Sequence, residues 1–130
     1  MAAEINLRLT SILESVMSAR HALDRLADVL PPEKLEDLRL VVSELVTNSV
    51  RHAGGSSYDQ ILLSVSVSAD SVQGRVCDAG PGFEVPYNPK PRPDLRGGWG
   101  LPIVESISDR WGVERCVNGE RLACVWFEIK

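Results

Sequence analysis

Three short segments carry residue types that could together bind a nucleoside triphosphate. They are Glu44-Leu-Val-Thr-Asn48, Asp78-Ala-Gly80-Pro-Gly82 and Gly98-Trp-Gly100-Leu101, in that order along the chain. The first places an acid and an amide one helical turn apart, the second places an acid before two glycines, and the third places glycines before a predicted helix. Each pattern is weak evidence alone, but the combination predicts an ATP site.

Glu44, Asn48 and His52 recur at every fourth residue, which aligns their side chains along one side of a helix. The helical angle places this row on the flank of an apolar stripe, where a side chain can face a cleft. The amide oxygen of Asn48 is a hard neutral ligand that suits Mg²⁺. Glu44 could orient or deprotonate a nucleophile that attacks a γ-phosphate. The alternative is a solvated helix flank without chemistry, and His52 has no assigned role beyond packing.

Asp78 follows Val72 and Val76 on one face of a predicted strand, so its carboxylate points toward the core if the valines do. A buried carboxylate is unfavourable unless it gains a strong donor, and the exocyclic amino group of adenine is such a donor. Gly80 and Gly82 would let the backbone approach a flat ring closely. The alternative is that Asp78 only forms a turn at the end of the strand.

The glycine-rich segment 97–101 precedes a predicted helix that has Pro102 in its first turn. Glycines before a helix N-terminus expose N–H groups and the positive end of the helix dipole to phosphate. Arg96 could add a positive charge for the β- or γ-phosphate. The alternatives are a plain flexible loop and a solvated arginine, and the bulky Trp99 inside the loop has no assigned role.

The elements that must position these residues follow from the hydrophobic pattern. Alternating apolar residues, and an Asn118-Gly119 hairpin turn, predict five strands. Helical periodicity predicts three helices, with Ser11 as the N-cap of the first. The predicted strands are 4–10, 61–68, 72–78, 111–117 and 121–129, and the predicted helices are about 11–30, 33–53 and 102–109. This order predicts an α+β two-layer sandwich, with a mixed, mostly antiparallel sheet covered on one face by three helices.

The composition limits the classes of function. A chain of 130 residues is expected to form a single domain, and its net charge of −4 gives no electrostatic case for binding nucleic acid. No apolar run is long enough to cross a membrane, and no signal peptide is apparent. Cys77, Cys116 and Cys124 are odd in number and lack CxxC spacing, which favours buried, reduced thiols in a cytoplasmic protein.

The three segments resemble the N box, the G1 box and the G2 box of the GHKL ATPases, the superfamily with the Bergerat fold. The resemblance runs from about Ser11 to the C-terminus. The segments 41–53 and 97–104 are especially similar to those of the anti-sigma factor serine/threonine kinases. The resemblance therefore implies a histidine kinase-like ATP-binding domain over residues 1–130, with ATP and Mg²⁺ as cofactors.

The resemblance also implies a role for each matching residue. Asn48 would hold Mg²⁺, Asp78 would bind the adenine amino group, and Glu44 would be the general base. Further glycines and one leucine would shape the adenine pocket or cover the phosphates: Gly80, Gly82, Gly98, Gly100 and Leu101.

The implied function is that of an anti-sigma factor and serine/threonine protein kinase that regulates transcription. Such a kinase phosphorylates a STAS-type anti-sigma factor antagonist and sequesters a sigma factor. The family also implies a homodimer through the first strand and its flanking helix. The alternative is a nucleotide-responsive regulatory module with the same fold that phosphorylates nothing. A detached histidine-kinase domain is disfavoured, because His21 and His52 are the only histidines and neither lies on a phosphoacceptor hairpin.

Overall fold

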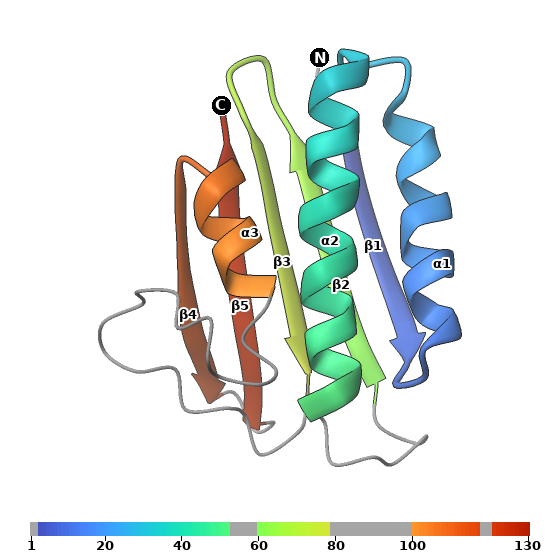
Figure 1. Cartoon of the computed structure of the whole chain (residues 1–130), viewed down its shortest axis with the longest axis vertical. Helices are drawn as coiled ribbons and strands as arrows, with labels where there is room; N and C mark the ends of the chain where they lie inside the picture. The colour runs from blue at the N-terminus through green and yellow to red at the C-terminus, as the bar shows by residue number, and fades with distance from the viewer. Residues whose placement is uncertain (1–2, 53–59, 79–99, 118–120) are drawn as a thin grey trace.

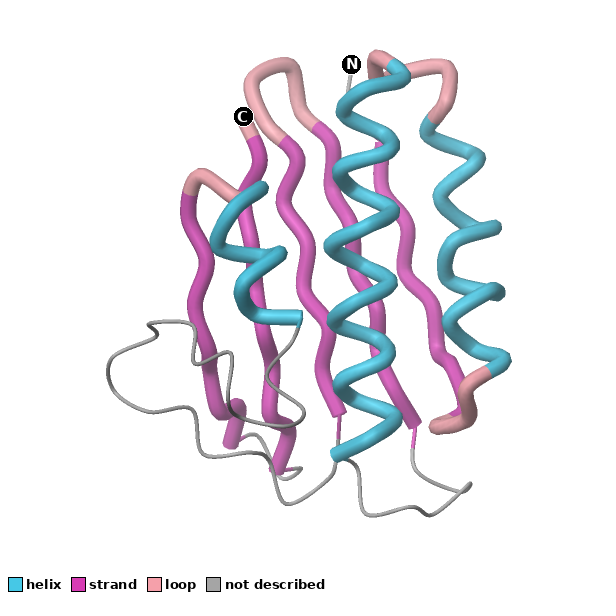
Figure 2. Tube along the Cα trace, viewed as in Figure 1, coloured by secondary structure: helices cyan, strands magenta, loops and turns pink. Residues whose placement is uncertain are grey.

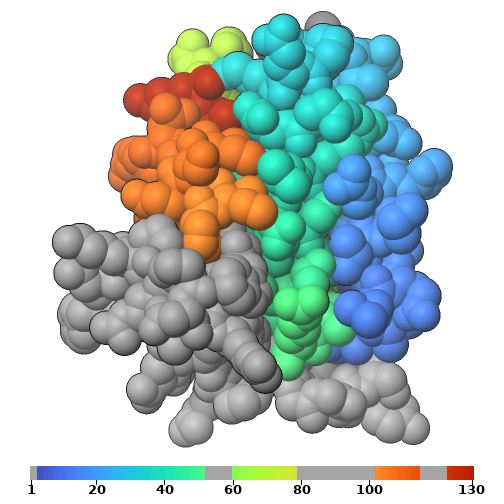
Figure 3. All heavy atoms as spheres, in the orientation of Figure 1, coloured from blue at the N-terminus to red at the C-terminus, as the bar shows by residue number. Residues whose placement is uncertain are grey.

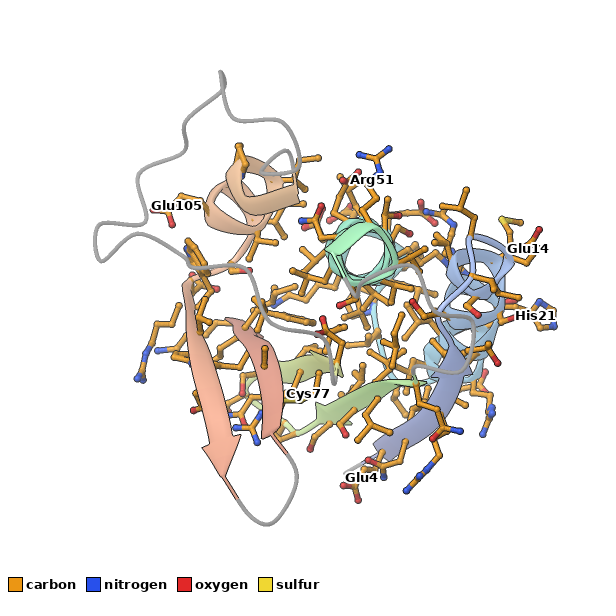
Figure 4. All side chains as sticks on the ribbon, turned by 90° about the horizontal axis from the view of Figure 1, so that it is seen from below. Glu4, Glu14, His21, Arg51, Cys77 and Glu105 are labelled. Carbon is orange, nitrogen blue, oxygen red and sulfur yellow. A yellow bond between two sulfur atoms is a disulfide. The ribbon has the colours of Figure 1, made fainter. Side chains whose placement is uncertain are left out.

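The structure has two layers, a five-stranded β-sheet and a set of helices that covers one of its faces (Figure 1). This computed structural model describes residues 3–52, 60–78, 100–117 and 121–130. Seen from one end, the helices lie on one side of the sheet, and Glu4 projects from the other side (Figure 4). The predicted α+β two-layer sandwich is confirmed.

The five strands form one sheet in the order β1-β2-β3-β5-β4. Every neighbouring pair of these strands is antiparallel. The sheet, predicted as mixed but mostly antiparallel, is thus antiparallel throughout the part of the chain that the structure describes. The strands are β1 (Ala3–Thr10), β2 (Gln60–Val67), β3 (Val72–Asp78), β4 (Arg110–Val117) and β5 (Arg121–Ile129).

Three α-helices and one short 3-10 helix form the second layer of the described chain (Figure 2). The longest helix, α2, lies between α1 and α3 and contacts both of them (Figure 3). The second and third predicted helices agree with α2 and α3 to within two residues at each end. The bounds are α1 (Glu14–Ala22), η1 (Leu23–Leu26), α2 (Pro32–His52) and α3 (Gly100–Ile107).

The first helix is shorter than predicted, and Ser11 does not cap it. Regular helix begins at Glu14, and the residue at the cap position, Leu13, makes no side-chain hydrogen bond. Ser11 Oγ is buried and has no hydrogen-bond partner. Ser15 Oγ instead donates a hydrogen bond of 2.6 Å to the carbonyl oxygen of Thr10. The turn out of β1 therefore holds Ser11 inside the protein, where it cannot reach the N–H groups at the start of the helix.

The core lies between the sheet and the helices. The inward residues of β2, which are Ile61, Leu63 and Val65, are at most 1% exposed, as the alternating pattern predicts. Leu38 and Val46 of the α2 stripe are fully buried against them. Burial of each such side chain contributes about 1.5–3 kcal/mol. This packing fixes the rotation of α2 about its axis, and so determines where its polar residues point.

Cys77 and Cys124 form a disulfide between β3 and β5. Both are buried, as predicted, but the expectation of reduced thiols is wrong for this pair. The two residues are 47 positions apart in the sequence, and the register of the strands places them directly opposite each other with a Cα–Cα distance of 4.0 Å. Sequence spacing alone could not reveal this proximity. The side chain of the third cysteine, Cys116, lies outside the described part of the structure.

Candidate functional site

The predicted site residues that the structure describes come from three elements that face one end of the sandwich. These elements are the C-terminal half of α2, the last residue of β3 and the first residues of α3 (Figure 1). α2 contacts both β3 and α3. The fold therefore brings the described parts of the three segments, which are separated in the sequence, to one end of the sandwich.

On α2, Asn48 is only 4% exposed, while Glu44 one turn earlier is half-buried. Leu45 and Val46 pack into the core, and Asn48 lies beside them at the edge of the apolar stripe, so its side chain also faces inward. The predicted flank position is confirmed for Glu44, whereas Asn48 lies deeper than expected. His52 is the last residue of α2, and its side chain lies outside the described part of the structure.

On β3, Asp78 is the last residue of the strand and is 4% exposed. It pairs with Ile61 of β2 and Ala123 of β5, and it shares the inner face of the sheet with Val76, which is 2% exposed. The period-two argument from the sequence is therefore confirmed. A carboxylate at this position presents acceptor oxygens from within the protein rather than from a solvated turn.

On α3, Gly100 and Leu101 are the first two residues of a helix that begins two residues earlier than predicted. Their main-chain N–H groups belong to the first turn, which has no intrahelical acceptors. The side chain of Leu101 is not described. The remaining predicted ATP-binding residues, and Trp99, lie outside the described residues: Gly80, Gly82, Arg96 and Gly98.

The described residues fit the groups that ATP and Mg²⁺ would present. Asp78 supplies carboxylate oxygens suited to an amino donor, and Asn48 supplies an amide oxygen suited to Mg²⁺. Both are buried, on elements that contact each other. Within the described residues no group of three or more His, Cys, Asp or Glu side chains could hold a metal ion alone. Mg²⁺ in nucleotide sites usually takes one or two protein ligands and the rest from phosphate and water, so a single amide oxygen is compatible with such an ion.

A groove of about 450 Å³ lies on the opposite, helix-free face of the sheet. Its two arginines are already engaged within the protein. Arg75 forms an ion pair of 2.9 Å with Glu114, and Arg110 lies over the ring of Trp126 at 6.0 Å from its centroid. The pattern of the sequence did not single out this groove. Because its cations are engaged and the predicted motifs lie elsewhere, we do not place the nucleotide there.

A comparison with family models identifies the family of this chain. The model of the histidine kinase-like ATPase domain matches residues 9–128. The chain belongs to this family. The histidine kinase-like ATPase family is the one whose boxes the three segments resemble, and an ATPase domain of this kind implies ATP binding. None of the helices in the described part of this ATPase domain has the length and apolarity needed to cross a bilayer.

The chain is also similar to curated proteins named as serine-protein kinases and as anti-sigma F factors. The chain is 33% identical over 88 residues to the serine-protein kinase RsbW of Oceanobacillus iheyensis, a match that covers 59% of this chain and 56% of that protein. It is 34% identical over 116 residues to the anti-sigma F factor of Pasteuria penetrans, which covers 82% of this chain and 77% of that protein. The matched region thus spans little more than half the length of the RsbW relatives.

Solved structures show the same fold. The RsbU and RsbW domains of Rv1364c from Mycobacterium tuberculosis superpose with a TM-score of 0.72 at 17% identity, covering 98% of this chain and 32% of that chain. The histidine kinase domain of the blue-light activated kinase of Erythrobacter litoralis EL346 gives a TM-score of 0.55 at 18% identity, covering 92% of this chain and 60% of that chain.

Proposed function

We propose that this protein is an ATP-dependent serine/threonine kinase of the anti-sigma factor type. Its substrate would be a STAS-type anti-sigma factor antagonist, and it would sequester a sigma factor when the antagonist is phosphorylated. We propose further that residues 1–130 act as one ATP-binding domain in the cytoplasm. The observation that carries this proposal is the burial of Asn48 and Asp78 on contacting elements, with Glu44 one helical turn from Asn48.

Each predicted site residue that the structure describes would have a distinct role in phosphotransfer. Asp78 would accept a hydrogen bond from the adenine amino group, and Asn48 would ligate Mg²⁺. When bound, ATP with Mg²⁺ supplies the transferable phosphoryl group and neutralises its charge. The half-buried carboxylate of Glu44 would hold the hydroxyl of a substrate serine and accept its proton. The N–H groups at the start of α3, from Gly100 and Leu101, would face phosphate oxygens.

A surface for a protein partner is supported by exposed apolar residues at the start of α1. Leu13 and Met17 are 62% and 68% exposed, and Ile12 beside them is 38% exposed. Leu13 is the N-cap residue of α1 and has helical backbone angles, so its side chain lies on the same side as that of Met17, four residues later. Exposed apolar side chains that gather in one place are typical of protein interaction sites. The same region, the first strand and its flanking helix, is where a homodimer is expected.

Calorimetric titration of ATP with and without Mg²⁺ tests the nucleotide site. We expect Mg²⁺-dependent binding that is lost in Asn48→Ala and retained in the matched control Asn6→Ala, an exposed asparagine of β1. Both variants are first checked for folding by circular dichroism. Absence of ATP binding by the folded wild type would refute the proposed function.

Phosphate transfer is tested separately, with radiolabelled ATP and a purified STAS-type antagonist. Incorporation of phosphate into a serine or threonine of the antagonist is expected. ATP binding without any transfer would instead favour the alternative function, a nucleotide-responsive interaction module.

A further inference from the structure

The disulfide between Cys77 and Cys124 lies directly beside the candidate adenine-binding residue. Cys77 precedes Asp78 in β3, and on β5 the corresponding partners are Cys124 and Ala123. The bond therefore joins the two strands one residue before the end of β3. Figure 4 views the molecule from this end and labels Cys77 within the sheet.

The side chains of Cys77 and Asp78 point to opposite faces of the sheet. Because side chains alternate along a strand, Cys77 faces away from the side on which Asp78 is buried. The sulfur atoms thus do not occupy the place proposed for the nucleotide. The disulfide would therefore influence Asp78 through the backbone of β3, in which Cys77 and Asp78 are neighbours.

The disulfide also closes a covalent ring in the chain. The ring spans residues 77–124 and contains Asp78 and the first turn of α3, with Gly100 and Leu101. Two of the segments that form the candidate site therefore lie on one cross-linked loop. A cross-link restricts the arrangements that such a loop can adopt.

We propose that the Cys77–Cys124 pair is a thiol–disulfide site whose redox state sets the nucleotide affinity of this protein. The proposal rests on the proposed nucleotide site at Asp78. In the disulfide form the cross-link holds the end of β3 against β5, so Asp78 is in place before the nucleotide arrives. In the dithiol form the end of the strand opens more readily, and binding must first order it again.

The chemistry requires a dithiol reductant. One thiolate of the reductant attacks a sulfur of the cystine, forming a mixed disulfide and releasing one cysteine thiolate. The second thiolate of the reductant then displaces the other cysteine. Two electrons and two protons pass to the protein, which gains two thiols, while the reductant becomes a disulfide. Because Cys77 and Cys124 are 6% and 1% exposed, attack requires local opening at the end of β3.

In the proposed cytoplasmic location, a redox role is the one that best accounts for a disulfide. Thiol reductants keep most cytoplasmic cysteines reduced, and the disulfides that do occur there usually serve catalysis or redox sensing. The side chain of Cys77 faces away from the side of the sheet on which Asp78 is buried, so a sensing role agrees better with the position of the pair than a catalytic one.

The test compares ATP affinity, measured by calorimetry with Mg²⁺, in the oxidised protein and in the protein reduced with dithiothreitol. The full chain carries Cys116→Ser, which removes the third thiol and keeps the pair. Peptide mapping without reductant establishes the redox state. We expect the Kd of the reduced form to be at least about fivefold higher, the lower end of typical coupling between two sites. By linkage, saturating ATP should make the disulfide harder to reduce by the same factor.

Four other results of this test would overturn the redox inference. Equal Kd values in the two forms would overturn this inference and leave the proposed kinase function standing. Failure to recover a Cys77–Cys124 peptide from the oxidised protein would overturn it as well. A reduced form that loses its circular dichroism signal would make the bond a structural requirement, which also overturns a regulatory role. No ATP binding in either form would refute the nucleotide site and this inference together.

Discussion

Gly74 of β3 lies directly opposite Phe127 of β5, and the phenyl ring occupies the space that a side chain at Gly74 would need. A Cβ atom at Gly74 would lie 3.0 Å or less from three ring atoms. Phe127 is fully buried, so the ring has little freedom to move aside. The pair packs β3 closely against β5 on the core side of the sheet, in the same strand that ends at Asp78.

Gly74→Ala should lower the free energy of unfolding by about 1–3 kcal/mol, because a methyl group there overpacks the core. Urea denaturation measures this as a lower midpoint at an unchanged m value. The control is Gly112→Ala on β4, whose added methyl group would lie 2.8 Å from the indole nitrogen of Trp126. Trp126 is only half-buried and can move toward solvent, so a smaller loss is expected. A larger loss in the control would contradict this explanation.

Asp78→Asn should weaken ATP binding about tenfold or more while changing GTP binding less, because a charged acceptor for the adenine amino group is lost. Competitive titration against a fluorescent nucleotide measures both affinities. Asp70→Asn is the matched control, since Asp70 is exposed in the turn between β2 and β3. Equal losses for ATP and GTP would refute the role of Asp78 in reading adenine.

Glu44→Gln should preserve ATP affinity and lower phosphotransfer about 10²- to 10⁴-fold, because the amide cannot accept the proton of the nucleophile. Single-turnover phosphorylation of a STAS-type antagonist measures the rate. Glu33→Gln, at the exposed start of the same helix, should leave the rate unchanged. Undiminished transfer in Glu44→Gln would show that Glu44 is not the general base.

Met17→Glu should weaken binding of the protein partner about tenfold or more, because it places a charge in an apolar contact. Stability should be unchanged, because Met17 is 68% exposed in the free protein. Surface plasmon resonance with an immobilised antagonist or sigma factor measures the affinity. Val113→Glu on β4 is the control, since Val113 is an exposed apolar residue far along the chain from α1. Similar losses in both variants would argue against a specific surface at α1.

The features that could be predicted from the sequence are those set by local periodicity. The apolar stripe of α2 and the alternation in β2 determine burial through spacing alone, so Leu38 and Leu63 were predictable as core residues. The same reasoning placed Asp78 on the inner face of β3. The family resemblance then connected Glu44, Asn48 and Asp78, which the fold brings to one end of the sandwich.

Features that depend on the register of distant strands could not be predicted in this way. The disulfide between Cys77 and Cys124 arises because β5 pairs with β3, and no local pattern indicates that partner. The depth of Asn48 depends on how α2 is rotated against its neighbours. The failure of Ser11 as a cap depends on the turn between β1 and α1, which buries Ser11 and leaves Leu13 at the cap position.

The position of β5 in the sheet determines when the sheet can be completed during folding. β5 follows β4 in the sequence, yet it lies between β3 and β4 in the sheet. Until residues 121–129 are available, β4 has no neighbour to join, and β3 lacks one of its two partners. Completing the sheet also requires closure of a long loop, which slows folding. A chain that stops before residue 121 would therefore lose the strand that connects β4 to the rest of the sheet.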